Sequence, residues 1–182
     1  MILVPKLGLV LGFGPFGEVV DNPAARLARG IDGRISGAVR FVGREMPTSY
    51  RRVVAFTEAV IAEVRPDVVV GIGVARSRSG IEVERVARNL ADPTLPDNDG
   101  ECRSFLDDGP SERTCDRAAE LAACLGCDVS DDAGRYVCNA WLYFALARSV
   151  PSFFVHVPDS EPSVDGFLGG LSRFLQPLSF TI

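Results

Sequence analysis

The run Val-Val-Val-Gly-Ile at residues 68–72 constrains the fold more than any other feature of the sequence. Successive side chains of a strand point to opposite faces, so a strand without polar residues has to be covered on both faces. This pattern is typical of a central strand in a parallel sheet that has helices on each side. The largely apolar segments Lys6–Leu11 and Phe153–Val157 have the same character. We expect them to be buried strands of the same sheet.

The rest of the chain alternates between strand and helix patterns. Further strands are expected at Val39–Val42, at Ile81–Val83, as a short edge strand, and at Cys127–Ser130. A helix is expected from Pro23 to Arg29 with Asn22 as its cap, and a longer one runs to Val64 from a cap at Thr48 or Ser49. Three more helices are expected over Ser111–Leu125, Cys138–Arg148 and Ser163–Leu175. Residues 91–110 are expected to form a loop. This alternation predicts a single α/β domain over residues 1–182, a three-layer α/β/α sandwich with a mostly parallel, mixed sheet.

Composition excludes several classes of function. The formal net charge of −5 gives the chain no overall cationic character for binding nucleic acid, and no apolar run reaches the roughly 18–20 residues that a membrane span needs. The first residues lack the basic region and cleavage site of a signal peptide. Five cysteines, an odd number, fit free thiols in a reducing cytoplasm. We therefore expect a cytoplasmic protein that binds neither nucleic acid nor membranes.

Two motifs in the chain are weak signals. Residues 12–17 read Gly-Phe-Gly-Pro-Phe-Gly, which matches the spacing of a dinucleotide-binding loop, but the next helix begins too late to meet a pyrophosphate. We interpret Phe13 and Phe16 instead as an aromatic wall at the carboxyl edge of the sheet, where α/β proteins bind ligands. The pair Cys124 and Cys127 closes a helix and lacks a second ligand pair, so we interpret it as structural thiols.

The strongest chemical signal is a cysteine, a histidine and a carboxylate. His156 is the only histidine of the chain and follows apolar strand residues. Cys138 follows a turn and opens a helix, where the helix dipole and free N–H groups would lower the pKa of its thiol. The same N–H groups could stabilise an oxyanion. Glu84 is the candidate for the carboxylate that fixes the tautomer of His156. Residue types alone are also compatible with a purely structural role for Cys138 and His156, because buried cysteines and strand histidines usually belong to the core.

Four segments of the chain resemble the pyrrolidone-carboxylate peptidases, also called pyroglutamyl peptidase I. They are Gly12–Gly17 with Asn22-Pro23, the segment from Glu84 to Asn89 with Pro96 to Gly100, Ala133–Asn139, and Phe154–Pro158. Their order and spacing agree with the family over nearly the whole chain. Four motifs in register are much more specific than any one of them.

This resemblance implies a phosphorylase/hydrolase-like fold and a cytoplasmic cysteine peptidase that removes N-terminal pyroglutamate from peptides and uses no metal or organic cofactor. It implies Cys138 as nucleophile, His156 as base and then acid, and Glu84 as the residue that orients the histidine. It also implies a pocket for the five-membered lactam, with Phe13 and Phe16 packing on the ring and with Asn22, Gly73 and Val74 as further binding residues. Members of the family are commonly homo-oligomers.

Three departures bear on specificity. The family usually reads Gly-Gln-Ala-Gly-Gly-Arg where residues 73–78 read Gly-Val-Ala-Arg-Ser-Arg, so Val74 replaces a glutamine and Arg76 a glycine. Thr94 stands where the family usually has an arginine, and the stretch from 100 to 133 is shorter. Two alternatives therefore stay open. The chain could be a related thiol hydrolase with another substrate, or a non-catalytic binding protein of the same fold.

Overall fold

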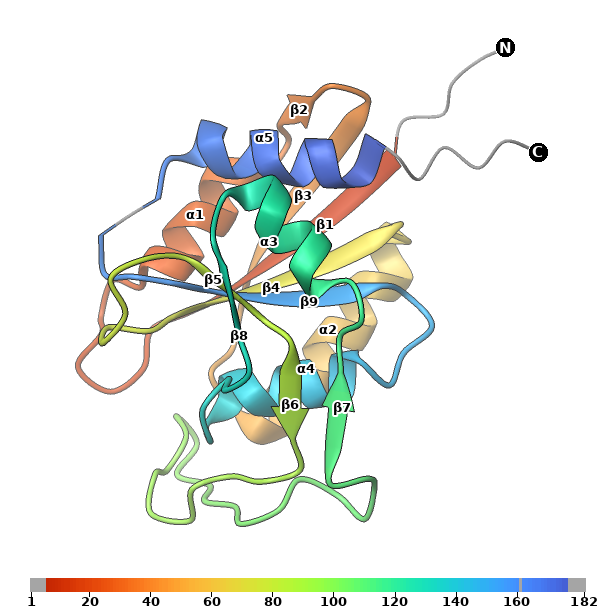
Figure 1. Ribbon diagram of the computed structural model, residues 1–182. Coiled ribbons are helices and arrows are strands. Elements are labelled where there is room, and N and C mark those ends of the chain that lie inside the picture. The colour runs from red at the N-terminus through yellow and green to blue at the C-terminus, as the bar shows by residue number, and fades with distance from the viewer. Residues whose placement is uncertain (1–5, 161, 177–182) are drawn as a thin grey trace.

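The computed structural model describes residues 6–160 and 162–176 (Figure 1). The strands are β1 (Lys6–Phe13), β2 (Ile35–Ser36), β3 (Val39–Met46), β4 (Val68–Val74), β5 (Glu82–Glu84), β6 (Val86–Arg88), β7 (Glu112–Thr114), β8 (Asp128–Ser130) and β9 (Ser152–Val157). The helices are α1 (Pro23–Ile31), α2 (Tyr50–Val64), α3 (Ala118–Leu125), α4 (Val137–Ala145) and α5 (Val164–Leu175). No helix within these described residues is long and apolar enough to cross a membrane.

The central sheet has seven strands in the order β2-β3-β1-β4-β9-β5-β8. The pairs β1–β3, β1–β4, β4–β9 and β5–β8 are parallel, whereas β2–β3 and β5–β9 are antiparallel. The predicted mostly parallel, mixed sheet is thus confirmed. All seven residues of β4 are buried, as the apolar run at residues 68–72 predicted.

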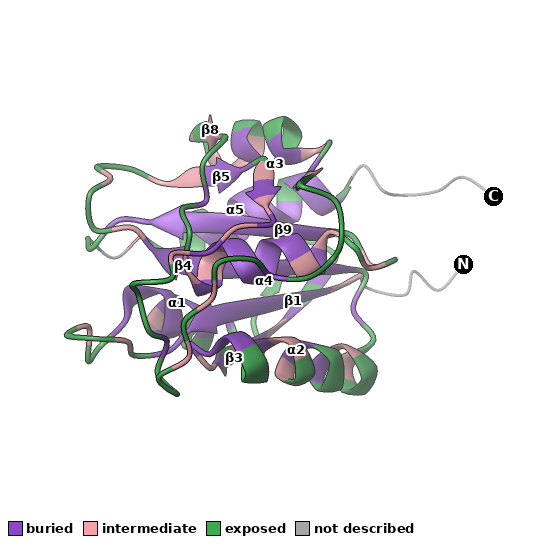
Figure 2. Ribbon diagram, turned by 90° about the horizontal axis from the view of Figure 1, so that it is seen from below, coloured by how far each residue is buried: buried purple, intermediate pink, exposed green. Residues whose placement is uncertain are grey.

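Helices cover both faces of the sheet, which makes three layers (Figure 1). Helices α1, α3 and α5 pack on one face, where Val10 of β1 contributes to the core. Helices α2 and α4 pack on the other face, and there the neighbouring Leu9 and Leu11 of the same strand face the core. Figure 2 shows the resulting pattern, with β1, β4 and β9 buried and the outer surface of α2 exposed.

The helix caps follow the sequence signals. Asn22 is the N-cap of α1 and its side chain accepts a hydrogen bond from the Ala24 N–H. Ser49, one of the two expected caps of α2, accepts one from the Arg52 N–H. Because α1 begins only at Pro23, its N-terminus is separated from residues 12–17 by a loop. A phosphate held by that glycine-rich segment would therefore not meet the helix dipole, and a dinucleotide site is not supported.

Three expectations about elements are wrong. The predicted helix Ser111–Leu125 is helical only from Ala118, because residues 112–114 form β7 and pair with β6 in a separate two-stranded sheet. The strand expected at Ile81–Val83 spans Glu82–Glu84 and is not an edge strand, because β8 pairs with its outer side. The helix expected to reach Arg148 ends at Ala145.

Candidate active site

A small pocket lies at the carboxyl ends of the central strands. Its volume is about 140 Å³, close to the roughly 150 Å³ of an apolar cavity that accommodates benzene. Its walls come from segments far apart in the chain: the end of β1, the end of β4, β9 and the start of α4. The residues that line it are Phe13, Phe16, Asn22, Thr48, Val74, Ala133, Tyr136, Cys138 and His156.

His156 is hydrogen-bonded to Glu84. Nδ1 of the ring lies 2.6 Å from Oε1 of the carboxylate. In the antiparallel pair β5–β9, His156 is opposite Glu82, so Glu84 is its diagonal neighbour two residues further along. Both side chains are buried, with Glu84 fully inaccessible to solvent. The pairing occupies Nδ1 and leaves Nε2 as the ring nitrogen that is free to exchange a proton.

The Glu84 carboxyl is held in its charged form. Burial alone would raise its pKa, but the hydrogen bond and charge of His156, together with the positive charge of Arg78, lower the pKa below its usual value. A carboxylate in this position favours a positive charge on the imidazole ring next to it.

The sulfur of Cys138 and the ring of His156 both lie next to Gly73. The register of β4 and β9 places Gly73 opposite His156. A Cβ on Gly73 would lie 2.8 Å from Cys138 Sγ and 3.3 Å from His156 Cδ2. A side chain at residue 73 would therefore occupy space that the thiol and the imidazole now border.

The thiol of Cys138 has a raised pKa. Burial raises it to about 12, and the negative charge of Glu84 acts in the same direction. The N–H of Cys138 and the charge of Arg78 act in the opposite direction but are weaker. The expectation of a lowered pKa is thus wrong here, because loss of hydration outweighs the helix dipole.

The N-terminus of α4 provides free hydrogen-bond donors beside the thiol. Tyr136 is the N-cap residue, and its side chain makes no capping hydrogen bond. The first N–H groups of a helix have no acceptor inside the helix, and Cys138 is the second residue of α4. A negatively charged oxygen bound at the thiol would find these donors and the positive end of the helix dipole nearby.

Most of the predicted binding residues line the pocket. Phe13 is buried at the end of β1, and Phe16 packs on Tyr136 with ring centroids 6.1 Å apart. Asn22 donates from Nδ2 to the Gly14 carbonyl at 2.9 Å, which fixes its side chain in the wall. Val74 is also part of the wall. Gly73 is not, since it lies behind the sulfur of Cys138.

Two of the residues that depart from the family pattern point away from the pocket. Arg76 is exposed, and its Nε donates to Asp159 Oδ2 at 2.9 Å. Thr94 is exposed, and its hydroxyl donates to Asp92 Oδ1 at 2.6 Å. Among these departures, only Val74 changes the chemistry of the pocket wall itself.

Arg78 and the wall residues Thr48, Ala133 and Tyr136 are functional positions that residue type did not mark as candidates. The sequence indicates Thr48 only as a possible helix cap, but its hydroxyl donates to the Gly14 carbonyl at 3.3 Å and the residue lines the pocket. Arg78 contacts Glu84 from the loop after β4. No local sequence signal marks these contacts, because their partners come from other strands and loops.

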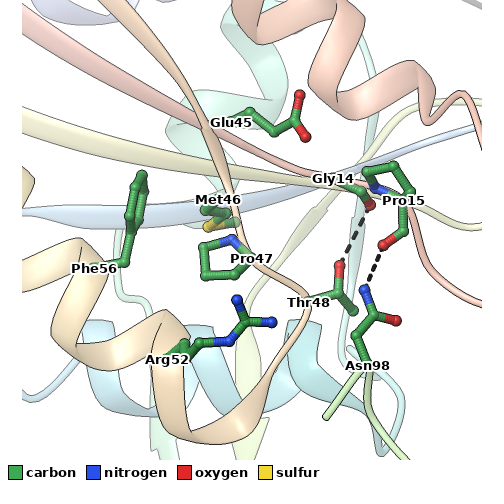
Figure 3. Close-up of a pocket in the computed structure, with 9 residues that line it drawn as sticks. All are labelled: Gly14, Pro15, Glu45, Met46, Pro47, Thr48, Arg52, Phe56 and Asn98. Atoms are coloured by element: carbon green, nitrogen blue, oxygen red, sulfur yellow. Dashed lines mark hydrogen bonds between the residues drawn. The ribbon is translucent and has the colours of Figure 1, made fainter.

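A wider groove of about 540 Å³ lies next to the pocket, and Thr48 belongs to both (Figure 3). Figure 3 shows Glu45 and Arg52 on opposite sides of it and Phe56 at one end. Arg29 pairs with Glu45, and Asp99 with Arg52. The groove has no cysteine or histidine in its wall, so the reactive groups belong to the smaller pocket.

The other cysteines lie apart from this pocket. Cys124 and Cys127 are free thiols at the end of α3, which closes at Gly126 as the sequence indicated. Burial raises the pKa of Cys127 to about 11 and that of Cys115 to about 11. Within residues 6–160 and 162–176, no three His, Cys, Asp or Glu side chains are grouped to hold a metal ion.

The fold and the site together describe a three-layer α/β protein with a thiol, an imidazole and a carboxylate grouped near the carboxyl ends of its central strands. A sequence model of the pyroglutamyl peptidase family matches residues 6–114, a range that includes Glu84 but ends before Cys138 and His156. This chain belongs to the pyroglutamyl peptidase family, a family of peptidases and hence of hydrolases.

Named relatives extend the similarity beyond the matched range. The pyrrolidone-carboxylate peptidase of Pyrococcus furiosus is 30% identical over 82% of this chain and 79% of its own length. That of Pseudomonas fluorescens is 34% identical over 88% of this chain and 82% of its own.

Solved structures give the same result. A mutant pyrrolidone carboxyl peptidase from P. furiosus has a TM-score of 0.84 at 25% identity, covering 95% of this chain and 100% of its own. Pyroglutamyl peptidase I from Bacillus amyloliquefaciens has a TM-score of 0.81 at 27% identity, covering 93% and 94%.

Proposed function

We propose that this chain removes N-terminal pyroglutamyl residues from peptides, with Cys138, His156 and Glu84 as a catalytic triad. The observation that best supports the proposal is the single pocket in which Cys138 and His156 face a wall containing Phe13 and Phe16. A five-membered lactam with its carbonyl oxygen has as many non-hydrogen atoms as benzene, so its size suits a pocket of about 140 Å³. Aromatic side chains are suited to pack on the faces of such a ring.

The proposed reaction begins with the thiol in its neutral form. As the substrate carbonyl reaches Cys138, the thiol proton passes to Nε2 of His156 while Glu84 stabilises the positive ring through Nδ1. The sulfur bonds to the carbonyl carbon, and the N–H groups at the start of α4 donate hydrogen bonds to the oxyanion. This order fits the high pKa of the free thiol, because the charges then form only once the substrate is present.

The second half of the reaction releases both products. The C–N bond breaks, and the proton on His156 goes to the leaving amine of the shortened peptide. Water then attacks the thioester with His156 as base, which releases pyroglutamate and restores the thiol. All five cysteines of the chain are free thiols, which fits the cytoplasmic location that we propose.

The test is hydrolysis of a fluorogenic pyroglutamyl amide. Turnover by the wild type and its loss in Cys138→Ser are the expected results. A wild type that does not hydrolyse the amide, or a Cys138→Ser variant with full activity, contradicts the proposal.

Val74 favours a second candidate, a thiol hydrolase of the same family with another small cyclic or amide substrate. Val74 is buried in the pocket wall and offers no side-chain hydrogen bond to a lactam. This candidate is supported if iodoacetamide alkylates Cys138 in a protein that does not hydrolyse pyroglutamyl amides. A Cys138 thiol that iodoacetamide does not alkylate contradicts this candidate as well.

A further inference from the structure

Arg78 is held by four oxygen atoms next to the triad. Its Nη1 lies 2.5 Å from Glu84 Oε1 and 2.5 Å from Glu82 Oε2. Its Nη2 donates to Ser130 Oγ at 3.2 Å and to the Asp132 carbonyl at 2.8 Å. The side chain is only 19% exposed. A guanidinium with this many partners has one orientation.

The contacts of Glu84 are concentrated on one oxygen atom. Oε1 contacts both Nη1 of Arg78 and Nδ1 of His156. Oε2 is buried and has no hydrogen-bond partner among the described residues. A buried carboxylate is unfavourable unless a positive charge or enough hydrogen bonds compensate it. While His156 is neutral, the permanent charge that contacts Glu84 is that of Arg78.

We propose that Arg78 is a positioning residue of the reaction: it keeps Glu84 ionised and directed at His156, and Glu82 fixes Arg78 from its other side. This inference rests on the proposed function, because it assigns Arg78 a part in the same proton transfer. Arg78 does not line the pocket, so it acts through Glu84 and not on the substrate.

The charges around Glu84 determine the sign of the effect. The charged or titratable groups that face it are His156 on β9, Cys138 on α4 and Arg78 after β4, while Glu82 on β5 itself pairs with Arg78. Two carboxylates and one guanidinium carry a net charge of −1, which protonation of His156 brings to zero. A more negative cluster holds protons more tightly, and a less negative one releases them more readily.

The experiment compares the pH profiles of two variants with opposite expected shifts. Arg78→Met makes the cluster more negative, so the acid limb of kcat/KM moves to higher pH by about one unit or more. KM for a small pyroglutamyl amide changes little, since Arg78 is outside the pocket. Glu82→Gln makes the cluster less negative and moves the same limb to lower pH. Arg78→Lys keeps the charge and retains a profile close to that of the wild type.

Arg85→Met is the matched control. Arg85 follows Glu84 directly, but its guanidinium pairs with the carboxylate of Asp131 and not with that of Glu84. Its profile remains that of the wild type. If Arg78→Met does not fold, Glu82→Gln decides alone, because Glu82 is one-third exposed and glutamine still offers an oxygen to Arg78.

A second readout separates this inference from the proposed function. The pH dependence of alkylation at Cys138, located by mass spectrometry, requires no substrate and shifts in the same directions as the acid limb. If the wild type shows no turnover but the variants still show these alkylation shifts, the proposed function is contradicted and the positioning role of Arg78 is supported. If the wild type is active, three results would overturn the role of Arg78. They are an acid limb that does not shift in Arg78→Met, a loss of activity in Arg78→Met that is the same at every pH, and an upward shift of the acid limb in Glu82→Gln.

Discussion

Nδ1 of His156 lies 2.6 Å from Oε1 of Glu84, although 72 residues separate them in the chain. The contact depends on the antiparallel pairing of β5 with β9 in an otherwise mostly parallel sheet. In this pairing Glu82 is opposite His156, so Glu84, two residues further along, points to the same face of the sheet as the imidazole. The catalytic proposal follows from this pair and from Cys138, which shares the pocket with the ring.

Replacing Glu84 by glutamine tests the carboxylate directly. The amide has nearly the same shape but no charge, so it cannot stabilise the positive imidazole ring. We expect kcat for a pyroglutamyl amide to fall by about 100-fold or more, with KM little changed. Steady-state kinetics provide the measurement. Glu58→Gln, at an exposed carboxylate paired with Arg148, is the control and retains activity. Equal rates in the wild type and Glu84→Gln would rule out the triad.

Replacing Gly73 by alanine tests the close approach of the thiol and the ring. The new Cβ would lie 2.8 Å from Cys138 Sγ and 2.9 Å from Phe154 Cζ, so the sulfur has to move. We expect loss of most activity and a decrease of about 1–3 kcal/mol in the free energy of unfolding. Denaturant unfolding and turnover measure the two effects. Gly80→Ala has open space around its Cβ and leaves both quantities unchanged. A fully active Gly73→Ala variant is incompatible with this geometry.

Val74→Gln tests the specificity of the pocket. A glutamine amide in the wall can hydrogen-bond a lactam, which valine cannot, and one such bond contributes about 0.5–1.5 kcal/mol. We expect KM for a pyroglutamyl amide to fall about two- to tenfold, in line with that free energy. Val74→Met, which has similar length but no amide, is the control and gives no improvement. If methionine improves KM as much as glutamine, the effect is packing and not hydrogen bonding.

The protonation state of Cys138 provides a prediction that does not involve substrate. Since burial raises its pKa to about 12, the free protein holds a neutral thiol at neutral pH. The thiolate absorbance of the wild type minus that of Cys138→Ser should therefore stay absent through neutral pH and appear only in strongly alkaline solution. An ultraviolet pH titration measures it. A thiolate signal that is already complete at neutral pH shows a preformed ion pair with His156 instead.

Features of the fold that depend on the local pattern were predictable from the sequence. The apolar run at 68–72, the Asn22 cap and the end of α3 at Gly126 all reflect preferences within a few residues. The β6–β7 pair was not predictable, because each strand has three residues and pairs only with the other. The alternating charges of residues 112–117 suit a surface strand as well as a helix face.

The candidate site likewise has residues that could be predicted from the sequence and residues that could not. Cys138, His156 and Glu84 could be selected by residue type and by resemblance to a family. The role of Arg78 could not, since it depends on where the loop after β4 turns relative to β5 and β8. The direction of the pKa shift of Cys138 was not predictable, because the sequence shows a helix start, which lowers a thiol pKa, but not the burial that raises it.

Turnover of a pyroglutamyl amide by three proteins tests the central claim most directly. The wild type and Cys102→Ser, which removes an exposed cysteine, should hydrolyse it at similar rates. Cys138→Ser should be inactive while its thermal unfolding matches that of the wild type. Hydrolysis by Cys138→Ser at the wild-type rate, or no hydrolysis by any of the three, would contradict the account.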